Sequence, residues 1–271
     1  MNAAEARMLD MLKRGRNDHG VVAVKAEFEA EGTRPDELLR LVDLTRRAGL
    51  DLALKIGGCE AVSDLHASRL YGADFIIAPM VETPYALSKF ADARDKVYGP
   101  DDTSARFLFN LETGASLDAL DAMLPIACQR LDGIVFGRVD FTLSLGLERG
   151  AINRPLITES VLKVADACRR NDLELVVGGS VAVEAADALR AIRAVRLDRF
   201  ETRKIVFDGA MAEGLAFNAA IDNAVAFELA WLENKRDYYG AIAREDAARI
   251  AMIRKRTISE PEIRFTDVVA A

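Results

Sequence analysis

Residues 73–99, ADFIIAPMVETPYALSKFADARDKVYG, contain the pattern that decides the fold. A short apolar run ends at a proline, and an amphipathic segment follows that starts at Thr83-Pro84 and stops at Gly99. Threonine before proline is a favourable start for a helix, and glycine is common just past a helix end. The stretch therefore predicts one strand followed by one helix.

The same unit recurs along the chain. Apolar runs at 21–29, 50–58, 73–82, 105–113, 133–140 and 173–180 each precede a segment with helical periodicity, and a seventh run lies at 198–208. Strand–helix alternation is typical of a parallel sheet covered by helices. No Gly-x-Gly-x-x-Gly or P-loop motif follows a strand, and polar residues stand at several strand ends. These features favour a (β/α)8 TIM barrel over an open doubly wound sheet. The eighth strand is either an irregular N-terminal segment or a second piece of 198–208.

Composition excludes several classes of protein. The chain has 271 residues, is 51% hydrophobic, and carries 36 basic and 43 acidic residues for a net charge of −7. This length buries a large core, and the composition does not fit a disordered chain or a disulfide scaffold. The acidic balance argues against a nucleic-acid partner. Three scattered cysteines, no signal peptide and no long apolar run predict a cytoplasmic protein that does not enter a membrane.

Residues 224–256 have helical periodicity and extend well past what a barrel needs. An apolar-striped helix outside a finished barrel covers another surface, most simply that of a second subunit. We therefore expect a barrel with an N-terminal helix over residues 1–222. A helical extension over residues 223–271 is expected to form a homo-oligomer.

Polar and ionisable side chains gather where the predicted strands end. In a barrel, alternate side chains point inward, and those at the carboxyl ends of the strands line the active site. Burying such charges is costly unless they pair or bind a metal ion, so the pattern indicates a functional site. The residues are Lys25, Glu27 and Glu29 in the first run, Lys55 in the second, Asn110 and Glu112 in the fourth, Arg138 and Asp140 after Ile134 and Phe136 in the fifth, and Glu201 and Arg203 in the last.

Glu112 and Asp140 are the strongest candidate metal ligands. They follow consecutive strands, and adjacent parallel strands lie about 5 Å apart, so the two carboxylates can share one cation. Mg²⁺ commonly takes one or two carboxylates and leaves its other positions to water and substrate. The alternative is that each carboxylate pairs with a lysine or arginine of the barrel.

Three stretches occur in an informative order: IIAPMVE, FLFNLET and GRVDFTLSLG. Together they resemble the HpcH/HpaI aldolase and citrate lyase β-subunit family, over roughly residues 20 to 220. The resemblance implies a metal-dependent barrel that cleaves or forms C–C bonds next to a 2-oxo acid or acyl-CoA. It implies Mg²⁺, Mn²⁺ or Co²⁺ on Glu112 and Asp140, and trimers or hexamers built through C-terminal helices. In such a site the cation stabilises the enolate of a chelated 2-oxo acid.

Two positions depart from the family pattern. Lys55 stands where the family has an arginine that supports the enolate oxygen, and lysine lacks the bidentate fork of arginine. Phe28 stands near the place of the histidine that serves as general base in the family's pyruvate aldolases. The two histidines of the chain, His19 and His66, fall in a predicted turn and a predicted helix.

Acidic residues are the remaining candidates for the base. Glu27 matches an acidic residue near the metal in the family, and Lys25 is either its ion-pair partner or a catalytic group. Glu29, Glu31 or a metal-bound hydroxide could take the proton. Glu29 and Glu31 could equally be solvated loop charges.

The substrate is expected to be small and acidic. Gly57, in a glycine pair, lets the backbone approach a ligand, and Glu82 stands at a predicted helix start that favours an anion. Arg138 replaces the family's usual proline and, like Arg203, is a candidate contact for a substrate carboxylate. Ordinary capping, tight turns and ion pairs are the alternative explanations for all four.

Three functions are compatible with these observations. The first is a metal-dependent lyase or aldolase that acts on a 2-oxo acid. The second is an aldolase that uses Lys55 as a Schiff-base nucleophile. The third is a non-catalytic barrel that binds an acidic metabolite or a partner subunit. The paired carboxylates favour the first, because a scaffold gains nothing from two adjacent buried acids.

Overall fold

A computed structural model describes residues 1–256. The chain divides into two compact units, Met1–Leu229 and Ala230–Ala271. The part of the expected C-terminal extension that follows residue 256 lies outside the described residues.

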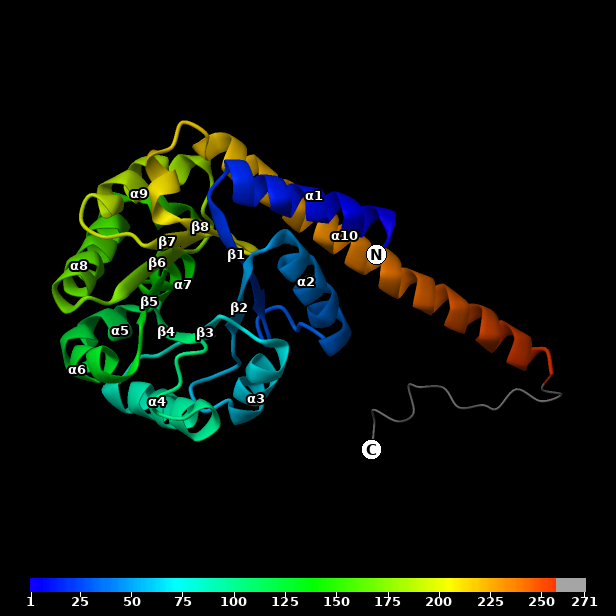
Figure 1. Cartoon of the computed structure of the whole chain (residues 1–271), viewed down its shortest axis with the longest axis horizontal. Coiled ribbons are helices and arrows are strands. Elements are labelled where there is room, and N and C mark those ends of the chain that lie inside the picture. The colour runs from blue at the N-terminus through cyan, green and yellow to red at the C-terminus, as the bar shows by residue number, and fades with distance from the viewer. Residues whose placement is uncertain (257–271) are drawn as a thin grey trace. The chain divides into compact units, whose positions relative to one another are not determined.

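The first unit is a closed eight-stranded barrel, as predicted, with its strands in chain order around the ring (Figure 1). The first seven strands are parallel to their neighbours in sequence. The strands are β1 (Val21–Glu27), β2 (Asp51–Lys55), β3 (Phe75–Ala78), β4 (Arg106–Leu111), β5 (Gly133–Gly137), β6 (Glu174–Gly178), β7 (Arg199–Glu201) and β8 (Ile205–Asp208).

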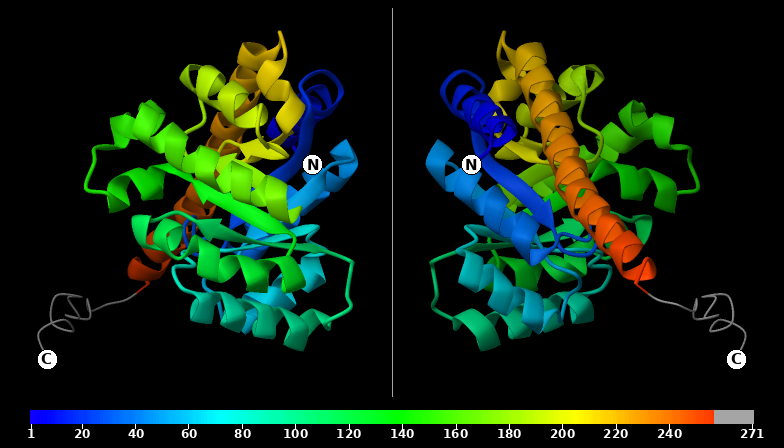
Figure 2. Two further views of the ribbon diagram at one scale, coloured as in Figure 1. Left: turned by 90° about the vertical axis from the view of Figure 1, so that its left-hand side faces the viewer. Right: turned by 90° about the vertical axis from the view of Figure 1, so that its right-hand side faces the viewer.

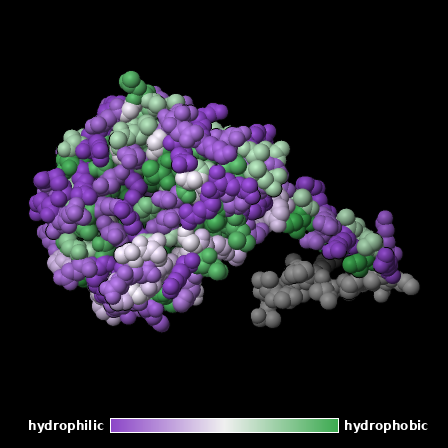
Figure 3. All heavy atoms as spheres, viewed as in Figure 1, coloured by the Kyte–Doolittle hydropathy of each residue, from purple (hydrophilic) through white to green (hydrophobic). Residues whose placement is uncertain are grey.

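Helices surround this ring of strands (Figures 1 and 2). The residues on the face of the molecule shown in Figure 3 are mostly hydrophilic. The α-helices are α1 (Ala3–Asp18), α2 (Pro35–Ala48), α3 (Val62–Tyr71), α4 (Pro84–Tyr98), α5 (Gly114–Asp118), α6 (Leu120–Arg130), α7 (Arg138–Ser144), α8 (Pro155–Asn171), α9 (Ala186–Arg193) and α10 (Phe217–Arg254). Short 3₁₀ helices are η1 (Arg149–Asn153), η2 (Val183–Ala185) and η3 (Gly209–Glu213).

The residues that mark the start and stop of α4 act as the sequence predicts. The Thr83 hydroxyl accepts a hydrogen bond from the Ala86 N–H at 3.1 Å, which satisfies one of the free donors of the first turn. Pro84 occupies the first turn, where its missing N–H costs nothing. The helix ends at Tyr98, directly before Gly99.

The eighth strand is the second piece of 198–208, and it runs opposite to the expected direction. β8 pairs antiparallel with both β7 and β1. Only residues 202–204 separate it from β7, whereas a parallel strand needs a crossover of a dozen or more residues. Thr202 and Ile205 close this turn, with the Thr202 N–H donating to the Ile205 carbonyl at 2.9 Å.

Small and branched apolar residues fill the middle of the barrel. This layer consists of Ala23, Ala53, Ile77, Leu108, Val135, Val176 and Val206. Because side chains alternate along a strand, the residues that follow on the same face toward the carboxyl ends are Lys25, Lys55 and Asn110, as the sequence predicts.

The predicted phase of the fifth strand is wrong. Val135 points inward, whereas Ile134 and Phe136 lie on the other face. There the ring centroids of Phe136 and Phe141 are 4.9 Å apart. The strand ends at Gly137, and α7 begins at Arg138. Asp140 therefore stands in the first turn of a helix and not at the end of a strand.

The unit that starts at Ala230 contains the later part of α10, which has exposed apolar side chains at Leu232, Tyr238, Ile242 and Ile250. Within the described part of the chain, every helix is too short or too polar to span a bilayer.

Candidate active site

Two adjoining cavities open at the carboxyl ends of the parallel strands. The first, called the main cavity, has a volume of about 460 Å³ and is lined by residues that follow β1, β2, β4, β5, β6 and β7. The second, called the side cavity, has a volume of about 420 Å³ and lies over β1 to β5. Both are lined by the predicted site residues Glu27, Lys55, Glu112 and Asp140.

Glu112 is more deeply buried than the neighbouring carboxylates Glu27 and Glu201. Its side chain is 2% exposed and directly follows β4. One carboxylate oxygen, Oε1, accepts the Met80 N–H at 2.9 Å, and Oε2 accepts the Asn110 amide at 2.7 Å. Lys55 Nζ lies 3.8 Å from Oε2. Burial raises the pKa of Glu112, and the negative charge of Asp140 adds to this effect, although Lys55 and the two hydrogen bonds oppose it.

The backbone beside Glu112 leaves room for its carboxylate. A Cβ atom at Gly137, the last residue of β5, would lie 2.6 Å from Glu112 Oε2. A side chain at this position would displace the carboxylate or the strand, so glycine is required by the close approach. Three residues further on, the exposed Asp140 lines both cavities from α7.

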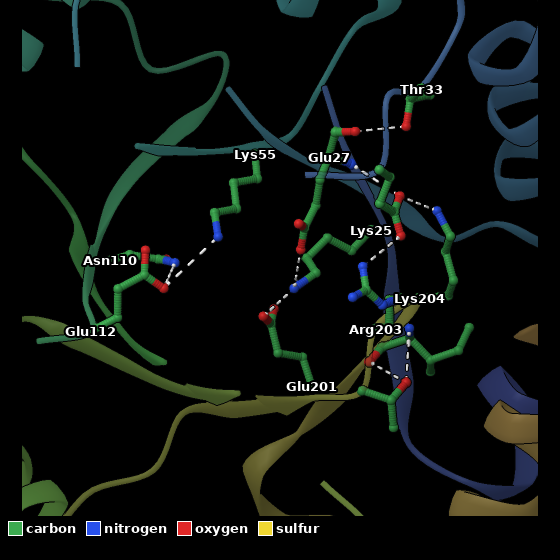
Figure 4. A network of polar contacts seen from close by, with 12 residues as sticks. Lys25, Glu27, Thr33, Lys55, Asn110, Glu112, Glu201, Arg203 and Lys204 are labelled. Atoms are coloured by element: carbon green, nitrogen blue, oxygen red, sulfur yellow. Dashed lines mark hydrogen bonds and ion pairs between the residues drawn. The ribbon is translucent and has the colours of Figure 1, made fainter. Parts of the chain in front are cut away.

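Lys25 lies between two carboxylates on the inner face of the barrel (Figure 4). Its Nζ is 3.2 Å from Glu27 Oε1 and donates a hydrogen bond to Glu201 Oε1. All three side chains are at most 10% exposed. Burial lowers the pKa of Lys25, but Glu201 and Glu27 outweigh it and raise the pKa above its usual value. Lys25 is therefore an ion-pair partner and holds its proton.

Glu27 remains ionised for the same reason. Burial raises its pKa, but the positive charges of Lys25 and Lys55 outweigh this cost and the net pKa is lowered. The Thr33 hydroxyl donates to the Glu27 carbonyl at 2.7 Å and fixes the end of the strand.

The two further glutamates of the β1–α2 loop differ in their surroundings. Glu31 is paired with Lys204 and lies 3.6 Å from Arg203, so its charge is already compensated. Glu29 is exposed and lines the side cavity beside Gly57. A Cβ atom at Gly57 would lie 2.6 Å from the Glu29 side chain. Arg203 lines the main cavity from the β7–β8 turn.

Arg138 and Glu82 line neither cavity among the residues described. Arg138 is 1% exposed and donates to the carbonyls of Gly178 and Gly179 at 3.3 and 3.0 Å, and to Asn153 Oδ1 at 3.0 Å. Burial lowers the pKa of Arg138 to about 10. Glu82 is exposed and accepts the Thr113 hydroxyl at 2.8 Å. Their predicted roles in substrate binding find no support in this geometry.

Sequence reasoning missed Arg149 and Ser180, which line the main cavity from η1 and from the loop after β6. Arg149 donates to the Ser180 hydroxyl at 2.9 Å. Arg149 lies outside the predicted strands, and Ser180 ends the run 173–180 without an ionisable side chain, so no pattern marked either as a site residue. Asn110, which the sequence places near the end of the fourth run, has a buried Oδ1 with no hydrogen-bond partner among residues 1–256.

The donor set fits a hard divalent cation. Glu112 and Asp140 supply carboxylate oxygens on one wall, and Asn110 adds a buried amide oxygen in the main cavity without a hydrogen-bond partner among residues 1–256. No cluster of three or more His, Cys, Asp or Glu side chains suited to a metal occurs in residues 1–256. Mg²⁺ does not need one, because it is commonly held by one or two carboxylates and keeps several waters.

A closed barrel with acidic and basic side chains at the carboxyl ends of its strands is the architecture of the (β/α)8 enzymes. The model of the HpcH/HpaI aldolase/citrate lyase family matches residues 46–201, and the chain belongs to this family. The match begins after β1, so Lys25, Glu27 and Glu29 lie outside it.

Solved structures show the same fold at low sequence identity. An HpcH/HpaI aldolase from Desulfitobacterium hafniense DCB-2 is 16% identical, with a TM-score of 0.58 over 72% of this chain and 82% of that one. A family protein from Burkholderia cenocepacia J2315 is 13% identical, with a TM-score of 0.56 over 93% and 91% of the two chains. A search of curated proteins found no match.

Proposed function

We propose that the chain is a divalent-metal-dependent lyase of the aldolase type that acts on a small 2-oxo acid, with Mg²⁺ as the best-fitting metal and Mn²⁺ or Co²⁺ as substitutes. The observation that carries this proposal is the pair Glu112 and Asp140. Glu112 directly follows β4, Asp140 lies in the first turn of α7 just after the neighbouring strand β5, and both line the same two cavities. Membership of the family supports the reaction class.

Glu112 and Asp140 would hold the cation. When bound, a divalent cation supplies the positive charge that stabilises an enolate. Lys55 adds a second positive charge from β2 and can donate a hydrogen bond to the enolate oxygen of the substrate. The Asn110 Oδ1 can accept a hydrogen bond from a substrate hydroxyl or a bound water. The hydrogen bonds from Met80 and Asn110 hold the Glu112 carboxylate in one orientation.

Glu29 is the best-placed general base. It lines the side cavity together with Lys55, Glu112 and Asp140, and it makes no ion pair with the other described residues. Glu27 is held by Lys25, and we assign it the role of shaping the charge around the metal. Gly57 and Arg203 complete the proposed substrate contacts, one in each cavity.

The remaining parts of the proposal concern assembly and location. The exposed apolar residues of α10 support a homo-oligomer, a trimer or hexamer, formed through the expected extension over 223–271. Free cysteines at 59, 128 and 168 are compatible with the cytoplasm.

The test is the exchange of the pyruvate methyl protons with deuterium, followed by NMR. We expect exchange with added Mg²⁺ or Mn²⁺, its loss with EDTA, and its recovery when metal is returned. Glu112→Gln and Asp140→Asn should each lower the rate by about 100-fold or more. Glu82→Gln is the matched control, because Glu82 is a carboxylate of the β3–α4 loop that lies outside both cavities. Exchange that survives EDTA, or borohydride trapping of pyruvate on Lys55, would contradict the proposal.

A further inference from the structure

The loop after β6 has an unusual conformation at the wall of the main cavity. Gly179 and Ser180 have φ angles of +90° and +49°, and both line this cavity. A positive φ in a serine is rare and costs energy, so the surrounding structure must impose it.

Arg138 fixes this loop from behind. Its buried guanidinium donates to the carbonyls of Gly178 and Gly179, and it has no carboxylate partner among residues 1–256. All peptide bonds here are trans, and in a trans peptide the C=O and N–H groups point in opposite directions. The N–H groups of Gly179 and Ser180 therefore point away from Arg138. Neither N–H donates a hydrogen bond within residues 1–256.

Arg149 adds a positive charge at the same place. Its exposed guanidinium donates to the Ser180 hydroxyl and makes no ion pair with the other described residues. Two amide donors, one hydroxyl and one guanidinium are thus gathered along one wall of the main cavity. Backbone N–H groups and arginine are the donors that proteins use for carboxylate and phosphate.

The charge balance of the main cavity favours an anion once a metal is present. Its lining has four cations and five carboxylates, so a divalent cation turns the net charge positive. Lys25 and Lys55 pair with carboxylates of the lining, and Arg203 pairs with Glu31 outside it. Arg149 is the one cation of the lining that has no ion pair with the described residues. The lining groups are Lys25, Lys55, Arg149 and Arg203, with Glu27, Glu112, Asp140, Glu201 and Glu228.

We infer that Arg149, Ser180 and the Gly179–Ser180 amides form a second anion site, which binds a carboxylate or phosphate on the carbonyl partner of the 2-oxo acid. Arg138 is the positioning residue that orients these amides. A volume of about 460 Å³ lies in the range of small-molecule sites and leaves room for such a partner beyond the metal. The identity of the partner rests on the proposed lyase function, whereas the anion site itself does not.

Anion binding is tested directly by isothermal titration calorimetry of the full chain. Inorganic phosphate and succinate are each titrated in the presence of Mg²⁺ and again after treatment with EDTA. We expect one of the two anions to bind in both conditions, and to bind more tightly with Mg²⁺ because the metal makes the net charge of the lining positive. The better binder identifies the preferred group. Arg149→Ala should weaken binding roughly 10- to 100-fold, the value of a charge-assisted contact, and Arg149→Lys should recover part of it. The control is Arg154→Ala, an exposed arginine that does not line the cavity.

Activity gives a second readout. For aldol addition of pyruvate, Arg149→Ala should lower kcat/KM for succinic semialdehyde or glyceraldehyde 3-phosphate relative to uncharged propanal, by a similar factor. The inference is overturned if neither anion binds the wild-type chain, if Arg154→Ala weakens binding as much as Arg149→Ala, or if Arg149→Ala lowers the charged and uncharged aldehydes equally. Absence of pyruvate proton exchange counts against the proposed function alone, because anion binding by the EDTA-treated chain is measured independently.

Discussion

Replacing Lys25 by methionine tests how much its two buried ion pairs contribute to the stability of the barrel. Lys25 is the shared partner of Glu27 and Glu201, which are both buried. Lys25→Met keeps a similar volume but leaves two carboxylates of the same sign without their cation. Removing one partner of a buried pair costs about 3–5 kcal/mol. We therefore expect Lys25→Met to lower the free energy of unfolding at neutral pH by about this amount.

The effect should depend on pH in a defined direction. Because the pKa of Glu27 is lowered, its ion pair stabilises the fold above the usual glutamate range, and this stability is lost as the pH falls through the lowered pKa. Because the pKa of Lys25 is raised, its contribution is lost only in strongly alkaline solution. The difference between wild type and Lys25→Met should thus be largest near neutrality and shrink toward about pH 4.

Urea unfolding followed by far-UV circular dichroism measures this difference at each pH. Lys89→Met is the control, because the Lys89–Glu60 pair is a surface pair with both side chains at least 35% exposed, and its removal should change little. Adding Glu201→Gln to Lys25→Met should recover part of the loss, since it removes one uncompensated charge. Equal destabilisation by Lys25→Met and Lys89→Met, or a difference that does not change with pH, would refute the reasoning.

Three further predictions concern the metal and the base. Gly137→Ala places a Cβ against the Glu112 carboxylate and should lower Mn²⁺ affinity about 10- to 100-fold, measured by calorimetry, whereas an unchanged affinity would show that Glu112 is not a ligand. Burial raises the pKa of Glu112, so protons should compete with Mn²⁺ at a higher pH than they would at an ordinary glutamate. When Mn²⁺ affinity is measured from about pH 8 to about pH 5, it should therefore begin to fall early in this range. An affinity that stays constant over the range would argue against the site. Glu29→Gln should slow pyruvate proton exchange by about 100-fold while Mn²⁺ affinity stays near that of wild type, and a wild-type exchange rate would assign the base elsewhere.

The barrel could be predicted because its pattern is local and repeated. Each strand–helix unit carries its own start and stop signals, such as Thr83-Pro84 and Gly99. The inward faces of β1, β2 and β4 followed from simple alternation, which placed Lys25, Lys55 and Glu112 at the cavities. The direction of β8 did not follow, because antiparallel pairing is decided by the length of a three-residue turn and not by the apolar pattern.

The roles of individual arginines could not be predicted from the sequence. Arg138 and Arg149 have the same chemistry and lie eleven positions apart. One is buried against carbonyls, and the other lines a cavity, because a helix start and a 3₁₀ turn direct them differently. The spacing of the two residues along the chain does not predict this difference, because the difference depends on where α7 begins.

The hairpin of β7 and β8 affects how the entrance is built. Most (β/α)8 enzymes connect the seventh and eighth strands by a loop and a covering helix. In this chain only the three residues 202–204 connect β7 and β8, so this connection contains no helix. Val225 and Glu228 of α10 stand at the main cavity and serve as its wall there. A shift of α10 at Val225 and Glu228 would therefore change the width of the cavity entrance at this point.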